Sequence, residues 1–133
     1  MNKTKIIIVD KNSLFLNIMK QFLITVLRCE IIGIATNGEA FLSMKNLRNA
    51  DIIFMDIEMS GINGFQSTIQ ILKNIPQAKI IAVSMYHDND LHKMLLECGY
   101  KGLVSKTNFY SEIIPAMSQV LQGGVYSNKV LID

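Results

Sequence analysis

The sequence has no long uninterrupted apolar stretch, no tryptophan, two prolines and two cysteines. No apolar run approaches the roughly 20 residues that a helix needs to cross a bilayer, and we expect no membrane interaction. Residues 1–5 (Met-Asn-Lys-Thr-Lys) lead directly into an apolar run, which is not the pattern of a signal peptide. Cys29 and Cys98 are too few and too far apart for a disulfide framework or a metal-binding pattern. Their number favours the reducing cytosol, and we expect a cytoplasmic protein.

A strong excess of charge is also missing. The formal net charge of +2 is too small to indicate nucleic-acid binding by itself. Apolar residues make up 50% of the chain and charged residues 18%, which is typical of a globular protein and excludes a disordered one. The length of 133 residues suits one domain with a two-sided core.

Apolar runs and helical patterns alternate along the whole chain. The predicted strands are residues 5–10, 30–35, 51–56, 79–84 and 101–106. The predicted helices lie within 13–28, 40–47, 65–74, 91–98 and 110–122. This order predicts an α/β fold with a doubly wound, five-stranded parallel sheet and helices on both faces.

The first predicted helix has apolar residues at a helical spacing, Leu14, Ile18, Phe22 and Val26, with Ser13 as its expected N-cap. Gly99 is the expected C-cap of the fourth helix. The two histidines of the chain, His87 and His92, are five residues apart and do not share a helical face. We expect them at the surface rather than on a metal.

Four of the predicted strands end in a polar residue: Asp10, Asp56, Ser84 and Lys106. The carboxyl ends of parallel strands meet at one edge of the sheet, and ligands bind there in open α/β folds. Two carboxylates at this edge could hold a divalent cation, and one could act as a nucleophile toward phosphate.

The motifs at this edge resemble those of the receiver domain of bacterial two-component response regulators. They are the run Ile6–Asp10, the segment Met55–Gly64, Ser84 after an apolar strand, and Gly102–Lys106. The resemblance covers essentially the whole chain. It implies a flavodoxin-like fold with strand order 2-1-3-4-5.

The resemblance also implies roles for individual residues. Asp56 matches the aspartate that accepts a phosphoryl group, Lys106 the lysine that pairs with it, and Ser84 the hydroxyl that binds the phosphoryl group. Asp10 and Asp56 match ligands of Mg²⁺, and Glu58 stands where the family uses a backbone carbonyl as a ligand. The implied partner is a sensor histidine kinase, and a weak homodimer is expected.

We place the receiver domain at residues 1–122, with 123–133 as a tail or the start of a linker to an effector domain. The segment from Val120 to Ser127 resembles the exit of receivers that continue into a LuxR-type helix-turn-helix domain, of the NarL/FixJ-like subgroup. Once the five units are assigned, no helix-turn-helix pattern is left, and we expect no DNA binding by these 133 residues themselves.

Five positions depart from the family pattern, two of them Ser60 and Thr107, where many members of the family have proline. Lys11 replaces the second acid of a pair, Met85 replaces a small residue after Ser84, and Leu103 stands where an aromatic side chain usually moves on activation. Two unit charges about 4 Å apart interact by roughly 4 kcal/mol at an effective dielectric of about 20. We therefore expect weak Mg²⁺ binding, unless Lys11 points into solvent or its ammonium takes the place of the cation.

Two other functions are compatible with the same fold. The first is a degenerate pseudo-receiver, a protein-interaction module without Mg²⁺-dependent phosphorylation. The second is a flavin-binding protein, which is disfavoured because the loop from Asp10 to Ser13 lacks the glycine- and hydroxyl-rich cradle for a flavin phosphate.

Overall fold

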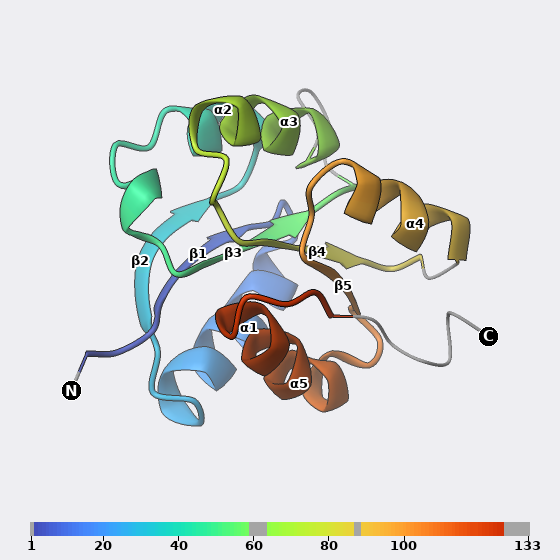
Figure 1. Cartoon of the computed structure of the whole chain (residues 1–133). Helices are drawn as coiled ribbons and strands as arrows, with labels where there is room; N and C mark the ends of the chain where they lie inside the picture. The colour runs from blue at the N-terminus through green and yellow to red at the C-terminus, as the bar shows by residue number, and fades with distance from the viewer. Residues whose placement is uncertain (1, 59–63, 87–88, 127–133) are drawn as a thin grey trace.

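A parallel five-stranded sheet forms the centre of the protein, with strand order β2-β1-β3-β4-β5 (Figure 1). The computed structural model describes residues 2–58, 64–86 and 89–126. The strands are β1 Lys5–Val9, β2 Glu30–Ala35, β3 Ile52–Asp56, β4 Ile80–Ser84 and β5 Gly102–Ser105. The predicted fold class, a flavodoxin-like doubly wound sheet, and its strand order are confirmed.

The helices cover both faces of this sheet. They are α1 Ser13–Thr25, α2 Gly38–Leu42, α3 Gly64–Asn74, α4 Asn89–Glu97 and α5 Phe109–Leu121, with a short 3₁₀ helix at Leu47–Asn49. Helices α1 and α5 lie on one face, and α2, α3 and α4 lie on the other (Figure 1). The described residues contain no helix that is both long and apolar enough to span a bilayer.

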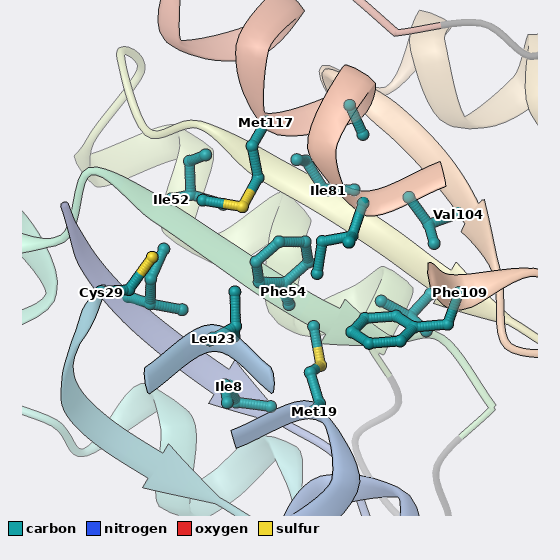
Figure 2. Packing of buried hydrophobic residues seen from close by; sticks show 14 of the residues in the cluster. Ile8, Met19, Leu23, Cys29, Ile52, Phe54, Ile81, Val104, Phe109 and Met117 are labelled. Carbon is teal, nitrogen blue, oxygen red and sulfur yellow. The ribbon is translucent and has the colours of Figure 1, made fainter. Parts of the chain in front are cut away.

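Alternate residues of the strands fill two cores, one on each face. On β1, Ile6 and Ile8 pack toward α1 and α5, while Ile7 and Val9 pack toward α2, α3 and α4. Figure 2 shows Phe54 at the centre of the first core, among residues of α1, α5 and the neighbouring strands. Burying one such side chain stabilises the fold by about 1.5–3 kcal/mol. Strands β1 and β3 are apolar on both faces, as expected of inner strands of a parallel sheet that is covered by helices on both sides.

The structure corrects the prediction for the first helix at its N-terminus. The cap is Asn12, whose side-chain oxygen accepts a hydrogen bond from the Phe15 amide at 3.0 Å, and Ser13 is the first helical residue. Asn and Ser are about equally good caps, so the sequence alone could not place the boundary to one residue.

The apolar face of α1 is also different from the predicted stripe. Leu16, Met19 and Leu23 are buried, whereas Leu14 is 70% exposed and Ile18 38% exposed. The helix carries apolar residues on more than one side, so a spacing of four residues fits two different faces. Contact with the sheet, which the sequence does not show, selects the face with Leu23.

Two further predictions change and one is confirmed. The second helix ends at Leu42, and Leu47 belongs to the separate 3₁₀ helix.

The prediction that both histidines lie at the surface is wrong for His92, which is buried on α4. His87 lies outside the described residues. Gly99 has φ +104°, a conformation that L side chains rarely adopt, and it follows α4 as predicted.

Candidate functional site

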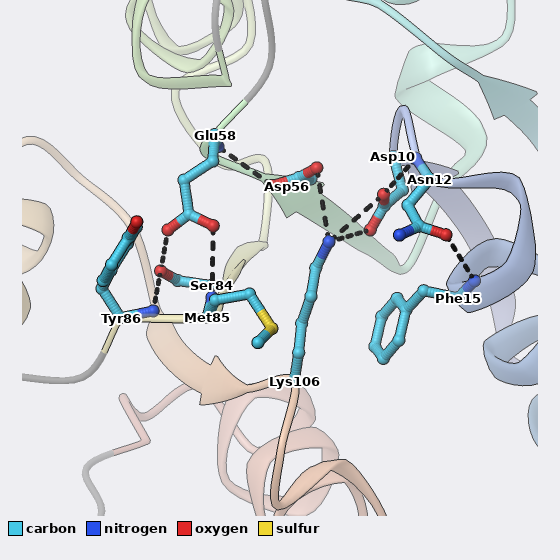
Figure 3. Close-up of polar contacts among 9 residues, drawn as sticks. All are labelled: Asp10, Asn12, Phe15, Asp56, Glu58, Ser84, Met85, Tyr86 and Lys106. Carbon is cyan, nitrogen blue, oxygen red and sulfur yellow. Dashed lines mark hydrogen bonds and ion pairs between the residues drawn. The ribbon is translucent and has the colours of Figure 1, made fainter.

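The polar residues predicted at the sheet edge do lie at the carboxyl ends of their strands. Asp56 and Ser84 are the last residues of β3 and β4. Asp10 follows β1 directly, and Lys106 follows β5. Because the strands are parallel neighbours, these four residues reach one edge, where they form two groups (Figure 3).

The first group is an ammonium between two carboxylates. Nζ of Lys106 lies 3.0 Å from Oδ2 of Asp10 and 3.5 Å from Oδ2 of Asp56. Asp10 and Asp56 are buried, and the Lys106 side chain is only 10% exposed. Formally, two negative charges share one positive charge away from bulk water, and this arrangement favours an additional cation.

The titration of Asp10 reflects this imbalance. Burial, with a smaller contribution from the neighbouring Asp56 carboxylate, raises the pKa of Asp10. The Asn12 amide, which donates to Oδ1 of Asp10 at 2.8 Å, and the Lys106 ammonium oppose that rise in pKa. A cation at this carboxylate would therefore relieve an unfavourable charge.

Two helices hold the Lys106 side chain in place. Its Nζ lies 4.9 Å from the centre of the Phe15 ring of α1, within the range of a cation–π contact. The Phe15 ring packs edge-on against Phe109 of α5, with their centres 5.5 Å apart. Lys106 is thus directed toward the carboxylates by packing as well as by charge.

The second group joins Glu58 to the end of β4. The Ser84 hydroxyl donates a hydrogen bond to Oε2 of Glu58, and the Met85 amide donates to Oε1 at 3.2 Å (Figure 3). The Glu58 amide in turn donates to Oδ1 of Asp56 at 2.9 Å. Glu58 therefore connects the two groups.

The carboxylate contacts of Glu58 were not foreseen, since the family pattern assigns a ligand function only to its carbonyl. A signal was present in the sequence: an acid two residues beyond Asp56, at the end of the strand next to β4. The register pairs Asp56 with Val83, and Ser84 then follows directly. An acidic side chain after β3 can therefore reach a hydroxyl at the end of β4.

Lys11, Met85 and Leu103, which depart from the family pattern, lie in different surroundings, while Ser60 lies outside the described residues. Lys11 is exposed, and the ammonium that contacts the carboxylates belongs to Lys106. Met85 is 55% exposed at the site, whereas Leu103 on β5 is completely buried. Of the two alternatives for Lys11, the structure agrees with the one in which it faces solvent.

The donor chemistry suits Mg²⁺ with few protein ligands. Asp10 and Asp56 offer carboxylate oxygens, and Mg²⁺ commonly keeps several waters beside one or two carboxylates. In the part of the chain that the structure describes, no group of three or more His, Cys, Asp or Glu side chains could hold a metal. A cation here would depend on Asp10, Asp56, backbone oxygens and water.

An open cleft of about 300 Å³ lies beside Lys106. Its lining is mostly apolar and comes from α1, the end of β4 and the loop after β5: Asn12, Leu14, Phe15, Ile18, Met85, Lys106 and Thr107. Leu14, Ile18 and Met85 are exposed apolar side chains of this lining.

Comparison with known proteins shows one family. Residues 6–118 match the profile of the response regulator receiver domain. The transcriptional regulatory protein DegU of Brevibacillus brevis is 30% identical over 125 residues, which cover 94% of this chain and 53% of DegU. The response regulator GacA of Pseudomonas aeruginosa is 26% identical over 122 residues, covering 92% of this chain and 57% of GacA. The chain thus spans about half the length of these relatives.

Solved structures share the fold. A LuxR-family two-component response regulator from Aurantimonas has a TM-score of 0.89 at 18% identity, covering 98% of this chain and 94% of that one. The isolated receiver domain of RcsB from Salmonella enterica, solved with the phosphate mimic BeF₃⁻, has a TM-score of 0.84 at 19% identity. It covers 98% of this chain and 97% of that one.

Proposed function

The chain belongs to the response regulator receiver domain family, and we propose that it accepts a phosphoryl group on Asp56 from a sensor histidine kinase and switches conformation in response. The observation that carries this proposal is the contact of Lys106 with both Asp56 and Asp10 at the sheet edge. Proteins of this family are mostly signal transducers rather than enzymes. The only chemistry we propose here is addition and removal of the chain's own phosphoryl group.

The proposed reaction is a displacement at phosphorus. An Asp56 oxygen forms a new O–P bond, while the P–N bond of a phosphohistidine, or a P–O bond of a small phosphodonor, breaks. The leaving group departs with the electron pair of the broken bond. Acetate leaves acetyl phosphate as the anion, and the imidazole of a phosphohistidine, which already carries a proton on its other nitrogen, leaves as the neutral ring. Lys106 holds its positive charge where the transferred oxygens become more negative, which lowers the barrier without forming a covalent bond.

Receiver domains generally bind Mg²⁺ at the phosphorylation site, and we propose that Asp10 and Asp56 hold it in this chain. Bound there, the ion would neutralise charge on the transferred group. The raised pKa of Asp10 supports this assignment, because an unfavourable negative charge gains from a cation. Glu58 would contribute only its backbone carbonyl, since its carboxylate is bonded to Ser84.

The remaining functional proposals rest on the relatives. Several of them are named transcriptional or response regulators and extend beyond the region matched here. We propose that residues 1–122 form the receiver domain and that 123–133 are a tail or the start of a linker to an effector domain. We further propose a cytoplasmic protein that forms a weak homodimer and leaves DNA binding to the effector domain.

Incubation with acetyl phosphate and Mg²⁺, followed by intact mass measurement, tests the proposal. We expect one added phosphoryl group on the unmodified chain and none on Asp56→Asn. The Asp51→Asn variant, which changes an exposed acid before β3, is the matched control and should still be labelled. A phosphorylated Asp56→Asn protein, or a phosphate mapped to Ser84, would refute Asp56 as the acceptor.

A second candidate function is a pseudo-receiver that binds partners without phosphorylation. The specific observation in its favour is that Glu58 already engages the Ser84 hydroxyl, the group expected to bind a phosphoryl oxygen. Lys11, in place of an acid, points the same way. This function would be favoured if the unmodified chain gains no phosphoryl group while its circular dichroism spectrum shows that it is folded.

A further inference from the structure

Two hydrogen-bond donors at the end of β4 converge on the carboxylate of Glu58. The Ser84 hydroxyl and the Met85 amide each donate to a different Glu58 oxygen. The Tyr86 amide donates to the Ser84 oxygen at 2.9 Å, which occupies that oxygen as an acceptor and leaves its proton for Glu58. Ser84 is fully buried. A hydroxyl and an amide aimed at one anion make an oxyanion site.

This oxyanion site adjoins the acceptor carboxylate. The Glu58 amide donates to Oδ1 of Asp56 at 2.9 Å, so the backbone that carries the Glu58 side chain is fixed beside Asp56. Lys106 contacts the other oxygen of Asp56, Oδ2, at 3.5 Å. A phosphoryl group on Asp56 would therefore extend toward donors that already hold the Glu58 carboxylate.

We propose that Glu58 is an internal competitor for the phosphoryl group, and that it sets how readily Asp56 is phosphorylated and how tightly an anion is held there. This inference rests on the proposed function of Asp56. One pair of donors cannot serve two anions, because a carboxylate and a phosphoryl group at the same place repel each other. The Glu58 side chain must leave Ser84 and Met85 before they can bind phosphoryl oxygens.

The surroundings allow this exchange. Glu58 is only partly buried, and the two residues after Ser84 are exposed, Met85 at 55% and Tyr86 at 67%. A released carboxylate can therefore enter water without crossing the core. The bound arrangement is favoured by hydrogen bonds to a charged acceptor, which are stronger than those between neutral groups. In the unphosphorylated chain the Glu58 carboxylate therefore occupies the two donors. Displacing it lowers the observed affinity of the site for another anion.

Three variants of Glu58 separate a hydrogen-bonded competitor from simple repulsion between charges. Glu58→Ala removes the side-chain oxygens and the negative charge. Glu58→Gln keeps a side chain long enough to reach Ser84 and Met85 but is uncharged. Glu58→Asp keeps the charge on a side chain that is one methylene shorter. The probe is beryllofluoride with Mg²⁺, and its dissociation constant is measured from amide shifts. We expect Glu58→Ala to bind beryllofluoride about tenfold more tightly than the unmodified chain, because no carboxylate has to leave Ser84 and Met85 first.

The other two variants decide the cause. If the hydrogen bonds matter, Glu58→Asp also binds the mimic more tightly, since it cannot reach both donors, and Glu58→Gln lies between Glu58→Ala and the unmodified chain. If repulsion alone matters, Glu58→Gln equals Glu58→Ala and Glu58→Asp shows no gain, which overturns the proposal. Glu97→Ala, an exposed acid at the end of α4, is the control and should change nothing.

A second measurement needs no mimic. Hydrogen exchange of the Met85 amide should become faster in Glu58→Ala, while exchange in β3 stays unchanged and shows that the variant is folded. Unchanged exchange at Met85 overturns the inference. Equal beryllofluoride affinity of the unmodified chain and Glu58→Ala refutes only the competition by Glu58. Absence of mimic binding in every variant refutes this inference together with the proposed function.

Discussion

The two groups at the sheet edge form two halves of the site, and these are held together in different ways. The Asp10 half contains Asp10, Asp56 and Lys106, and the Ser84 half contains Ser84, Met85 and Glu58. On the Asp10 side, three charged groups come from positions far apart in the sequence and balance incompletely, two carboxylates against one ammonium. On the Ser84 side, one carboxylate meets a hydroxyl and an amide, and each of its oxygens has a donor. The Asp10 half therefore favours binding of another cation, whereas the Ser84 half already contains an anion, the Glu58 carboxylate. This contrast predicts that the two halves respond oppositely to loss of a charge.

Removing the ammonium should have the largest effect on stability. Lys106→Met leaves Asp10 and Asp56 buried without their shared partner, and loss of one partner from a buried ion pair costs about 3–5 kcal/mol. We expect a loss of that order in the free energy of unfolding in urea at neutral pH. Mg²⁺ should restore part of the loss, because it supplies the missing positive charge.

The control for this variant is Lys93→Met, which changes an exposed lysine on α4. It should unfold at nearly the same urea concentration as the unmodified chain, with or without Mg²⁺. If Lys106→Met behaves like Lys93→Met, the ammonium does not balance the two carboxylates, and the comparison between the halves fails.

Removing one carboxylate should have a smaller effect of the opposite sign. In Asp10→Asn, Lys106 pairs with Asp56 alone, and we expect a gain of less than about 2 kcal/mol in unfolding free energy without Mg²⁺. The same variant should lose Mg²⁺ affinity, since it lacks a ligand.

The pH dependence of the unmodified chain provides a check on Asp10. Its pKa is raised in the folded state, so the folded protein binds its proton more tightly than the unfolded chain does. The ionised carboxylate is therefore destabilising above the folded pKa. That contribution fades as the pH falls from the raised pKa toward the ordinary value near 3.8. Urea midpoints measured over this window should show the change in the unmodified chain and not in Asp10→Asn.

The charge at position 11 should have a weaker effect on Mg²⁺. Lys11 is exposed, so its repulsion of a cation is screened by water and salt. We expect Lys11→Asp to tighten Mg²⁺ binding by about tenfold or less, or about 1.4 kcal/mol at most. Calorimetric titration at low and high salt measures it. A gain that is independent of salt would place the new carboxylate on the metal itself.

Most of the fold could be predicted from the sequence because the strands are short apolar runs, and four of the five predicted strands end in a polar residue. The face of α1 could not, since Leu14 and Ile18 are as apolar as Leu16 and Leu23, and only contact with the sheet decides between them. Asp10, Asp56 and Lys106 were placed correctly beside one another because parallel strands bring their ends together.

The sequence placed Ser84 at the sheet edge but did not reveal its contact with the Glu58 carboxylate. The bond to Glu58 depends on the direction of one side chain after β3, and neither spacing nor periodicity determines that direction. For the same reason the burial of His92 was missed, since helix α4 is covered by neighbours that a helical wheel does not show. Long-range packing decided both cases.

The smallest expected effect concerns how the two halves communicate on phosphorylation. Leu103 is completely buried on β5 among Leu95, Tyr100 and their neighbours, and it has neither a ring nor a polar tip that would favour a second position in water. A conformational response needs states that differ in free energy, and the exposed pair Met85 and Tyr86 can provide them beside Ser84. We therefore expect a phosphate mimic to change amide shifts and exchange most at Met85 and Tyr86. His87 and Asp88, which follow Tyr86 in the chain, lie outside the described residues.

Substitution of Leu103 makes this prediction decisive. Leu103→Met conserves volume, so it should cost less than about 1.5 kcal/mol of stability and leave the response at Met85 and Tyr86 intact. Tyr86→Ala, at a side chain that is 67% exposed, should leave stability nearly unchanged and reduce the shift changes at Met85. If the mimic instead moves the Leu103 amide most, and Leu103→Met abolishes the changes at Met85, the signal passes through β5. The donors of the Ser84 half would then bind the mimic without causing the conformational change.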